Sequence, residues 1–198
     1  MREVIAPRDV VVPDQLLDRT RSRSSTFFGE GIAAHVSLAD PFCPELRTLL
    51  ASAARKAGAR VHEGGTYLCM EGPAFSTRAE SRLYRSWGVD VIGMTNLTEA
   101  KLAREAELCY ATLALVTDYD CWHDEEEDVT VEALLAHLRA NADLAAHALR
   151  CAVAALPRER VACGCGRALA TAVVTARDEI PKETRERLGP ILDRWLGA

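Results

Sequence analysis

The sequence lacks long apolar runs and runs of basic residues. No stretch reaches the roughly 20 apolar residues that a membrane-spanning helix needs. The start, Met1-Arg2-Glu3, has no apolar core of a signal peptide. The net charge is −5 and the basic residues are scattered, which argues against nucleic acid as a partner. We therefore expect no membrane and no nucleic-acid partner.

The sequence also lacks an even number of cysteines, since it has seven, so they cannot all pair in disulfides within the chain. A chain of 198 residues can bury a core without disulfides, so we expect reduced thiols and a cytoplasmic protein. Cys163-Gly164-Cys165 could be a strained disulfide, half of a metal site, or two thiols. No second cysteine pair lies nearby in sequence, so zinc is disfavoured and two thiols are preferred. Cys43 and Cys109 adjoin apolar segments and could pair in a stabilised relative.

What is present fits one globular domain over residues 1–198. The hydrophobic share of 48% and the charged share of 27% are ordinary for such domains. Residues 68–122 predict strand, helix, strand, helix, strand. Thr77 and Glu80 have capping-box spacing at the start of the first helix, and Gly88 is placed to end it. The strands are expected at residues 68–70, 89–92 and 109–116, and the apolar run of the last predicts a strand covered on both faces.

Polar or aromatic residues follow each of these three strands. They comprise residues 71–75, the pair Met94-Thr95, and the pair Asp118 and Asp120. In open α/β sheets ligands bind beyond the carboxyl ends of the strands. The pattern therefore predicts one binding site at this edge of the sheet.

Outside this stretch the pattern predicts core elements. Residues 9–17 are expected as a strand with a bulge or edge position at Pro13. Residues 32–38 are expected as a strand containing His35, and residues 19–29 as an exposed loop, or else a lid or subunit contact. A helix is expected at residues 44–57. Another is expected at residues 131–156, with an apolar stripe in the core.

Several motifs closely resemble the 5′-methylthioadenosine phosphorylases, a branch of the trimeric purine nucleoside phosphorylases. They are EGPAFSTRAE at residues 71–80, GMTN at 93–96 and TDYDCW at 117–122, supported by DQLLDRT at 14–20 and HVSLADPFCP at 35–44. The resemblance implies an α/β fold of three layers, α/β/α, with a mixed central sheet. It also implies an N-terminally incomplete chain covering the C-terminal two thirds of the family fold. The family's upstream third holds a Gly-rich phosphate loop and Arg-His phosphate contacts.

The resemblance further implies the reaction. It is the phosphorolysis of 5′-methylthioadenosine to adenine and 5-methylthioribose 1-phosphate, in purine and methionine salvage. A homotrimer is implied, with inorganic phosphate as co-substrate and no metal or organic cofactor. One alternative is an inactive, truncated remnant that acts as a non-catalytic subunit. Another is a phosphorylase for a different purine nucleoside. Because Thr95 is the one phosphate contact that the motifs supply, we expect negligible phosphorolysis from this chain by itself.

Asp118 and Asp120 are the candidate catalytic residues. A purine leaves the sugar more readily when it is protonated, and a carboxylic acid with a raised pKa can supply that proton. The two aspartates are two residues apart, so in an extended segment both side chains would point to the same side. Their mutual repulsion would then favour sharing one proton. They could equally be turn and cap residues. A metal site formed with the acidic run at 123–128 is disfavoured, because such runs suit a helix N-terminus. By resemblance, Asp118 contacts adenine N7 and Asp120 lies near the exocyclic amine.

The other candidates bind substrate. Phe75 could stack on the purine, although alone it would be read as a core residue. Ser76 could cap a helix, line the pocket, or do both. By resemblance, Met94 contacts the sugar hydroxyls and Thr95 the phosphate. Thr117 is a further lining residue.

Two more regions enter through the resemblance alone. Val131 and Leu135 match the family's apolar wall around the 5′-alkylthio group. His35 matches a residue that reaches the pocket of a neighbouring subunit, whereas a lone histidine in a strand is usually structural.

Overall fold

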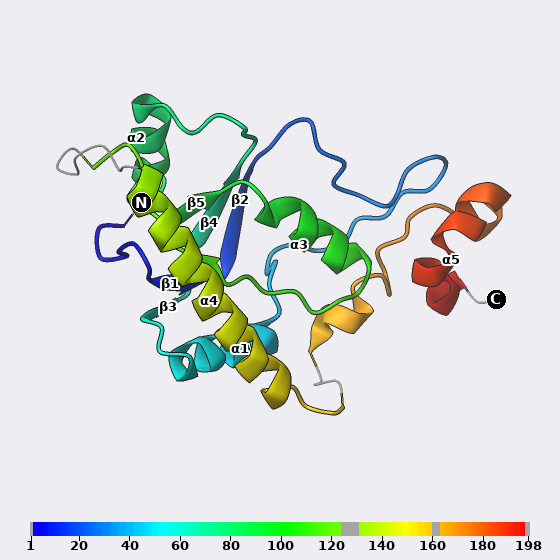
Figure 1. Cartoon of the computed structure of the whole chain (residues 1–198). Helices are drawn as coiled ribbons and strands as arrows, with labels where there is room; N and C mark the ends of the chain where they lie inside the picture. Colours follow the sequence, from blue (N-terminus) through cyan, green and yellow to red (C-terminus); the bar gives the residue numbers. More distant parts are fainter. Residues whose placement is uncertain (1, 124–130, 160–162, 197–198) are drawn as a thin grey trace.

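The computed structural model describes residues 2–123, 131–159 and 163–196, without the side chains of residues 131–134. The strands are β1 Val10–Val12, β2 Gln15–Arg19, β3 Val61–Glu63, β4 Thr66–Met70, β5 Val91–Gly93 and β6 Ala114–Leu115. The helices are α1 Pro44–Lys56, α2 Arg78–Ser86, α3 Asn96–Glu105, α4 Val131–Ala155 and α5 Lys182–Leu196. Two short 3₁₀ helices, η1 Gly164–Arg167 and η2 Arg177–Glu179, lie between α4 and α5. Figure 1 shows their arrangement.

The centre of the fold is formed by two pairs of parallel strands, β1 with β3 and β2 with β4. Both runs of chain bend between the first pair and the second. Val10 pairs with Val61 in β1 and β3, and Gln15 pairs with Thr66 in β2 and β4, so the register is the same on both sides of the bend. Pro13 interrupts the first strand, and Gly64 and Gly65, with φ of 83° and 101°, interrupt the second. The single strand predicted for residues 9–17 is therefore two strands. The break falls at the proline because its nitrogen cannot donate to a ladder.

Two further strands extend these pairs in opposite directions. β5 adds parallel to β4, while β6 adds antiparallel to β1, which makes the arrangement mixed. The predicted strand at 109–116 is wrong in length, since only Ala114–Leu115 is a strand. It is also half-buried and not covered on both faces. Its outer residues form part of a pocket wall, described below.

Helices cover both faces of the strands, as the predicted three-layer fold requires. Along β4, Leu68 packs against Tyr84 of α2, whereas Tyr67 and Cys69 face the cluster that contains Leu97 of α3. This alternation follows from the two-residue period of a strand. Around β1, Val10 packs with Ala54 of α1 and the helix α4 behind it.

The face that α4 turns to the core overlaps only in part with the predicted apolar stripe, which included the buried Ala152. Its buried or half-buried contacts with the body are made by Leu144, Ala148, Cys151 and Ala152. Leu138, Leu149 and Val153 of the predicted stripe are 45%, 52% and 67% exposed. The small alanines of α4 lie against Ala53 and Ala54 of α1. Leu138 and Leu149 are consequently on the outside, whereas Leu144 packs against the body.

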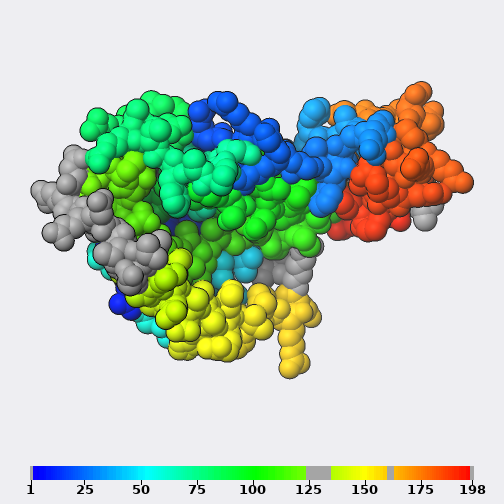
Figure 2. Space-filling view, turned by 45° about the horizontal axis from the view of Figure 1, so that its top comes forward, coloured from blue at the N-terminus to red at the C-terminus, as the bar shows by residue number. Residues whose placement is uncertain are grey.

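The chain ends in a separate hydrophobic cluster, here called the C-terminal lobe, formed by residues 163–196 together with residues 27–36. Its buried core is Phe28, Ile32, Leu169, Ala172, Ile180, Leu188 and Leu192. Figures 1 and 2 show this lobe at one end of the molecule. Residues 32–38 are not the predicted strand: they make one isolated bridge, Ala34 with Val173. None of the described helices is both long and apolar enough to cross a bilayer.

Candidate functional site

A pocket of about 760 Å³ lies where β4, β5 and β6 end. Phe75 and Ser76 line it after β4, Met94 and Thr95 after β5, and Thr117, Asp118 and Asp120 after β6. Seven of the ten candidate residues are thus brought to one cavity. The segment that contains β6 lines the pocket along its whole length and not only at its end, because residues 111–116 all form part of the wall.

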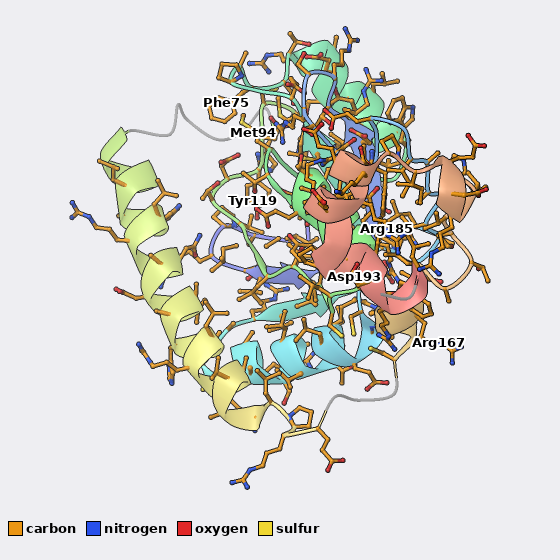
Figure 3. All side chains as sticks on the ribbon, turned by 90° about the vertical axis from the view of Figure 1, so that its right-hand side faces the viewer. Phe75, Met94, Tyr119, Arg167, Arg185 and Asp193 are labelled. Atoms are coloured by element: carbon orange, nitrogen blue, oxygen red, sulfur yellow. The ribbon has the colours of Figure 1, made fainter. Side chains whose placement is uncertain are left out.

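The turn after β4 is shaped to place Phe75 at the rim. Gly72 has φ 70°, and a Cβ there would lie 2.7 Å from the Sδ of Met94. A side chain at this position would therefore push the β4 turn away from Met94. Phe75 is 83% exposed, so it is not a core residue. Figure 3 shows Phe75, Met94 and Tyr119 on the side of the body that faces α4.

Asp118 and Asp120 do not lie in an extended segment. Asp120 has φ 66°, and its backbone N–H donates to Oδ1 of Asp118 at 2.8 Å. Oδ2 of Asp118 accepts from Thr117 Oγ1 at 2.7 Å, while Oδ2 of Asp120 accepts from Ser81 Oγ at 2.7 Å. The predicted geometry, with both carboxylates on one side, is wrong, because the chain turns between them. Asp118 is left exposed in the pocket, and Asp120 is tied to α2.

The helix α2 anchors the turn that carries both aspartates. Its predicted capping box is present: Glu80 N–H donates to Thr77 Oγ1 at 3.2 Å, and Thr77 N–H donates to Glu80 Oε2 at 2.8 Å. Arg85 stacks its guanidinium 3.6 Å from the ring centroid of Trp122. Together with the Ser81 bond, these contacts fix the 117–122 turn to a rigid helix.

Arg23 joins the strand ends below the pocket. Its guanidinium donates to the backbone carbonyls of Met94, of Glu71 at 2.6 Å and of Met70 at 3.2 Å. The carboxylate of Glu71 lies 3.8 Å from Arg23 Nε. The sequence predicted an exposed loop here, or else a lid or subunit contact. A single arginine in a polar loop carries no signal that it will satisfy three carbonyls of two strands.

A polar floor was also missed by the sequence analysis. Tyr110 Oη donates to Asn96 Oδ1 at 3.0 Å and lies 2.8 Å from Glu99 Oε2, and Thr112 Oγ1 donates to Asn96 Oδ1 at 2.7 Å. All four line the pocket, and the buried Asn96 Nδ2 has no partner among the described residues. Burial disfavours ionisation of the neighbouring Tyr67 and raises its pKa to about 12, so this phenol stays neutral at physiological pH. The floor therefore offers hydrogen-bonding groups beside the exposed carboxylate of Glu99.

Thr95 lies at the N-cap position of α3 and does not cap it with its side chain. Backbone N–H groups at a helix N-terminus, together with the helix dipole, favour an anion. The hydroxyl of Thr95 is exposed beside them. This is the part of the pocket best suited to a phosphate.

The three remaining candidates lie elsewhere. Leu135 is 47% exposed and does not line the pocket, whereas Leu138, one turn further along α4, does. Val131 begins α4, but its side chain lies outside the described residues, as do residues 124–128 of the acidic run. His35 is exposed in the C-terminal lobe and does not line the pocket of its own chain.

Comparison with known proteins agrees with this geometry. Residues 1–154 match the family model described as the phosphorylase superfamily. The chain belongs to this superfamily. It is 56% identical over 197 residues to the S-methyl-5′-thioadenosine phosphorylase of Koribacter versatilis, a match that covers 100% of this chain and 67% of that protein.

Solved structures give the same family and fold. The chain is similar to a methylthioadenosine phosphorylase from an antarctic soil metagenomic library, with a TM-score of 0.92 and 48% identity over 96% of this chain and 68% of that one. It also resembles a mutant adenosine/methylthioadenosine phosphorylase from Schistosoma mansoni in complex with methylthioadenosine. That match has a TM-score of 0.74 and 34% identity over 80% of this chain and 62% of the other. The fold is that of the purine nucleoside phosphorylases, and the chain spans about two thirds of these relatives' length.

Proposed function

We propose that the pocket binds 5′-methylthioadenosine for phosphorolysis to adenine and 5-methylthioribose 1-phosphate. The observation that carries the proposal is the meeting of Phe75, Met94, Thr95 and Asp118 in one cavity. These four residues follow three strands, and each has the chemistry that one part of the substrate needs. The identity to methylthioadenosine phosphorylases over the whole chain supports the same substrate.

The base is assigned to the side formed by Phe75 and Asp118. The exposed ring of Phe75 offers a face for stacking on a purine. The carboxyl of Asp118 is exposed in the pocket and held by Thr117 and by the N–H of residue 120. We assign this carboxyl to N7 of the purine. Asp120 is assigned a positioning role, because its carboxylate is already bonded to Ser81.

The sugar and the phosphate are assigned to the β5 end. Met94 is assigned to the ribose, and Thr95 with the N-terminus of α3 is assigned to the phosphate, because both residues line the pocket and Thr95 is at the N-cap position of α3. A phosphate oxygen forms a bond to C1′ as the N9–C1′ bond breaks, and the electron pair goes to the base. Asp118 gives a proton to N7. The proton that HPO₄²⁻ loses on becoming the sugar phosphate restores the one that Asp118 gives to the purine, so the protons balance. Inorganic phosphate is the co-substrate, and we propose no metal or organic cofactor for this step.

The apolar wall for the 5′-methylthio group is assigned to α4. Leu138 lines the pocket, and Val131 and Leu135 lie on the same helix. We further propose that the protein acts as a homotrimer in the cytoplasm, with His35 completing the pocket of a neighbouring subunit. His35 is exposed and lies outside the pocket of its own chain, as such a role requires.

The test of the reaction is adenine release from 5′-methylthioadenosine, measured by chromatography with and without inorganic phosphate, in protein that also carries the upstream third of the family fold. Release should depend on phosphate. Asp118→Asn should lower it by about 10²–10⁴-fold, as loss of a positioned acid does, and should shift preference towards 5′-methylthioinosine. Phosphate-independent release would indicate hydrolysis and contradict the proposal, as would an unchanged rate in Asp118→Asn.

The test of the assembly is light scattering at micromolar protein, where we expect three times the mass of the chain. His35→Ala should leave that mass unchanged and raise KM, because His35 is assigned to substrate and not to the interface. A monomer would contradict the shared pocket.

A further inference from the structure

Four cysteines from three separate segments meet at the junction between the body and the C-terminal lobe. Cys43 directly precedes α1, Cys109 follows α3, and Cys163 and Cys165 lie at η1. Their four Sγ atoms all lie within 4.8 Å of one another, and those of Cys109 and Cys163 are 3.3 Å apart. The second cysteine pair that the sequence spacing did not reveal is therefore supplied by the fold.

Local structure holds these segments in place. The backbone N–H of Cys43 donates to the carbonyl of Tyr110 at 2.8 Å, which fixes the first segment against the second. The third segment is fixed by Glu107, whose carboxylate accepts from the N–H of Leu169 at 2.9 Å and from Trp195 Nε1 at 3.0 Å. Cys43 and Cys165 are buried, while Cys109 and Cys163 are half-buried. The cluster is thus formed by several parts of the fold and sheltered from solvent.

The sulfur separations suit one tetrahedral metal ion. With Zn–S bonds of about 2.3 Å, the sulfurs of a tetrahedral site lie ~3.8 Å apart. All seven cysteines lie in the described part of the chain, and none of them is in a disulfide, which would need sulfurs about 2.05 Å apart. Four thiolates are ligands for zinc and exclude magnesium and calcium, which prefer oxygen.

We propose that Cys43, Cys109, Cys163 and Cys165 bind one zinc ion. Four protein ligands leave no open position, so the ion is structural and takes no part in the reaction. Its effect is to join the start of α1, the segment after α3 and the C-terminal lobe. The proposal does not depend on the substrate of the pocket, because none of the four cysteines lines it.

The first test is metal content of the chain purified under reducing conditions with zinc. Mass spectrometry of the metal should find one zinc per chain. Replacing zinc with cobalt should give the visible and thiolate charge-transfer absorption of tetrahedral Co²⁺–sulfur sites. Cys109→Ser removes a metal ligand. It should therefore weaken zinc binding by more than the roughly 10–100-fold lost when a residue that only hydrogen-bonds a ligand is removed. Cys151→Ser and Cys121→Ser, outside the cluster, are the matched controls and should bind zinc as the original chain does.

The second test needs no variant, so it does not depend on the folding of a mutant. The native chain is treated with a thiol-alkylating reagent with and without bound zinc, and the modified cysteines are identified by mass spectrometry. Zinc should protect Cys109 and Cys163, which are half-buried, and leave the reactivity of Cys121 and Cys151 unchanged. Equal reactivity with and without zinc would overturn the proposal. So would disulfides among the four cysteines in metal-free protein that is fully folded.

Discussion

The pocket and the four-cysteine cluster are built in opposite ways. Most of the pocket comes from one continuous stretch, residues 67–120, in which each strand is followed at once by the side chains that it delivers. The cluster instead joins segments far apart in the chain, with Cys109 and Cys163 separated by 54 positions. The pocket keeps several polar side chains exposed for a ligand, whereas the cluster is buried or half-buried. The difference shows that most pocket residues can be identified from one short stretch of sequence, whereas the cysteine cluster forms only when distant segments fold together.

This comparison can be tested with substitutions that remove either a local or a long-range contact near the pocket. Substitution of Arg23 should have the largest effect on stability, because Arg23 joins the ends of β4 and β5 from a distant loop. Arg23→Met keeps the aliphatic stem but removes the donors for the carbonyls of Met70, Glu71 and Met94. Bonds from a charged donor are worth about 1.5–3 kcal/mol each, and water reaches the 23% exposed side chain of Arg23, so we expect a loss of unfolding free energy of at least about 3 kcal/mol. Urea denaturation measures this change.

Arg21→Met is the matched control for Arg23. Arg21 is exposed and contributes its backbone N–H, not its side chain, to the bond with Glu71 at 2.7 Å. A surface substitution of this kind should alter stability by less than about 0.5 kcal/mol. Equal losses in the two variants would show that the guanidinium does not hold the strand ends.

Asp120 should give the second largest effect, and on stability more than on chemistry. Asp120→Gly tolerates the φ of 66° and removes the acceptor for Ser81, whose side chain is fully buried. A buried hydroxyl left without its partner costs about 1–3 kcal/mol, which thermal unfolding should detect. Asp120→Asn retains an acceptor oxygen and should lose less than half as much. If Asp120→Gly keeps full stability but loses activity as strongly as Asp118→Asn, then Asp120 acts on the substrate and not on the turn.

These local motifs explain why so much of the site could be predicted. The capping box, the Gly88 helix end and the three strand exits follow from short-range rules, and they place seven candidate residues in the pocket. The failures arose where a distant contact decides the local structure. Residues 32–36 of the predicted strand instead form part of the C-terminal lobe. The shared-proton geometry of Asp118 and Asp120 is replaced by a turn bonded to α2. The orientation of α4 depended on the small residues of α1, which the helical period by itself does not identify.

The α4 wall gives a smaller and more specific effect. Leu138 lines the pocket and Leu135 does not, so Leu138→Ala should reduce the preference for methylthioadenosine over adenosine. A lost apolar contact of this kind is worth about 1–3 kcal/mol, or 10–200-fold in the ratio of kcat/KM values. Leu135→Ala is the control on the same helix face and should change the ratio less. A larger effect at Leu135 would mean that α4 turns a different face to the bound nucleoside.

The capping box of α2 should give the smallest effect and test whether a purely local device reaches the site. Thr77→Ala removes the hydroxyl that accepts from the N–H of Glu80, and such losses cost about 0.5–2 kcal/mol. Because α2 holds Asp120 through Ser81, weaker capping should raise the backbone amide exchange of the 117–122 turn as well as that of α2.

The control is Ser86→Ala at the other end of α2. The hydroxyl of Ser86 is exposed and donates to the carbonyl of Leu83 at 2.7 Å. This substitution should change stability by less than about 0.5 kcal/mol and leave the turn unaffected. Faster exchange confined to α2 in Thr77→Ala would show that the turn is held by its own bonds, and that the helix merely lies beside it.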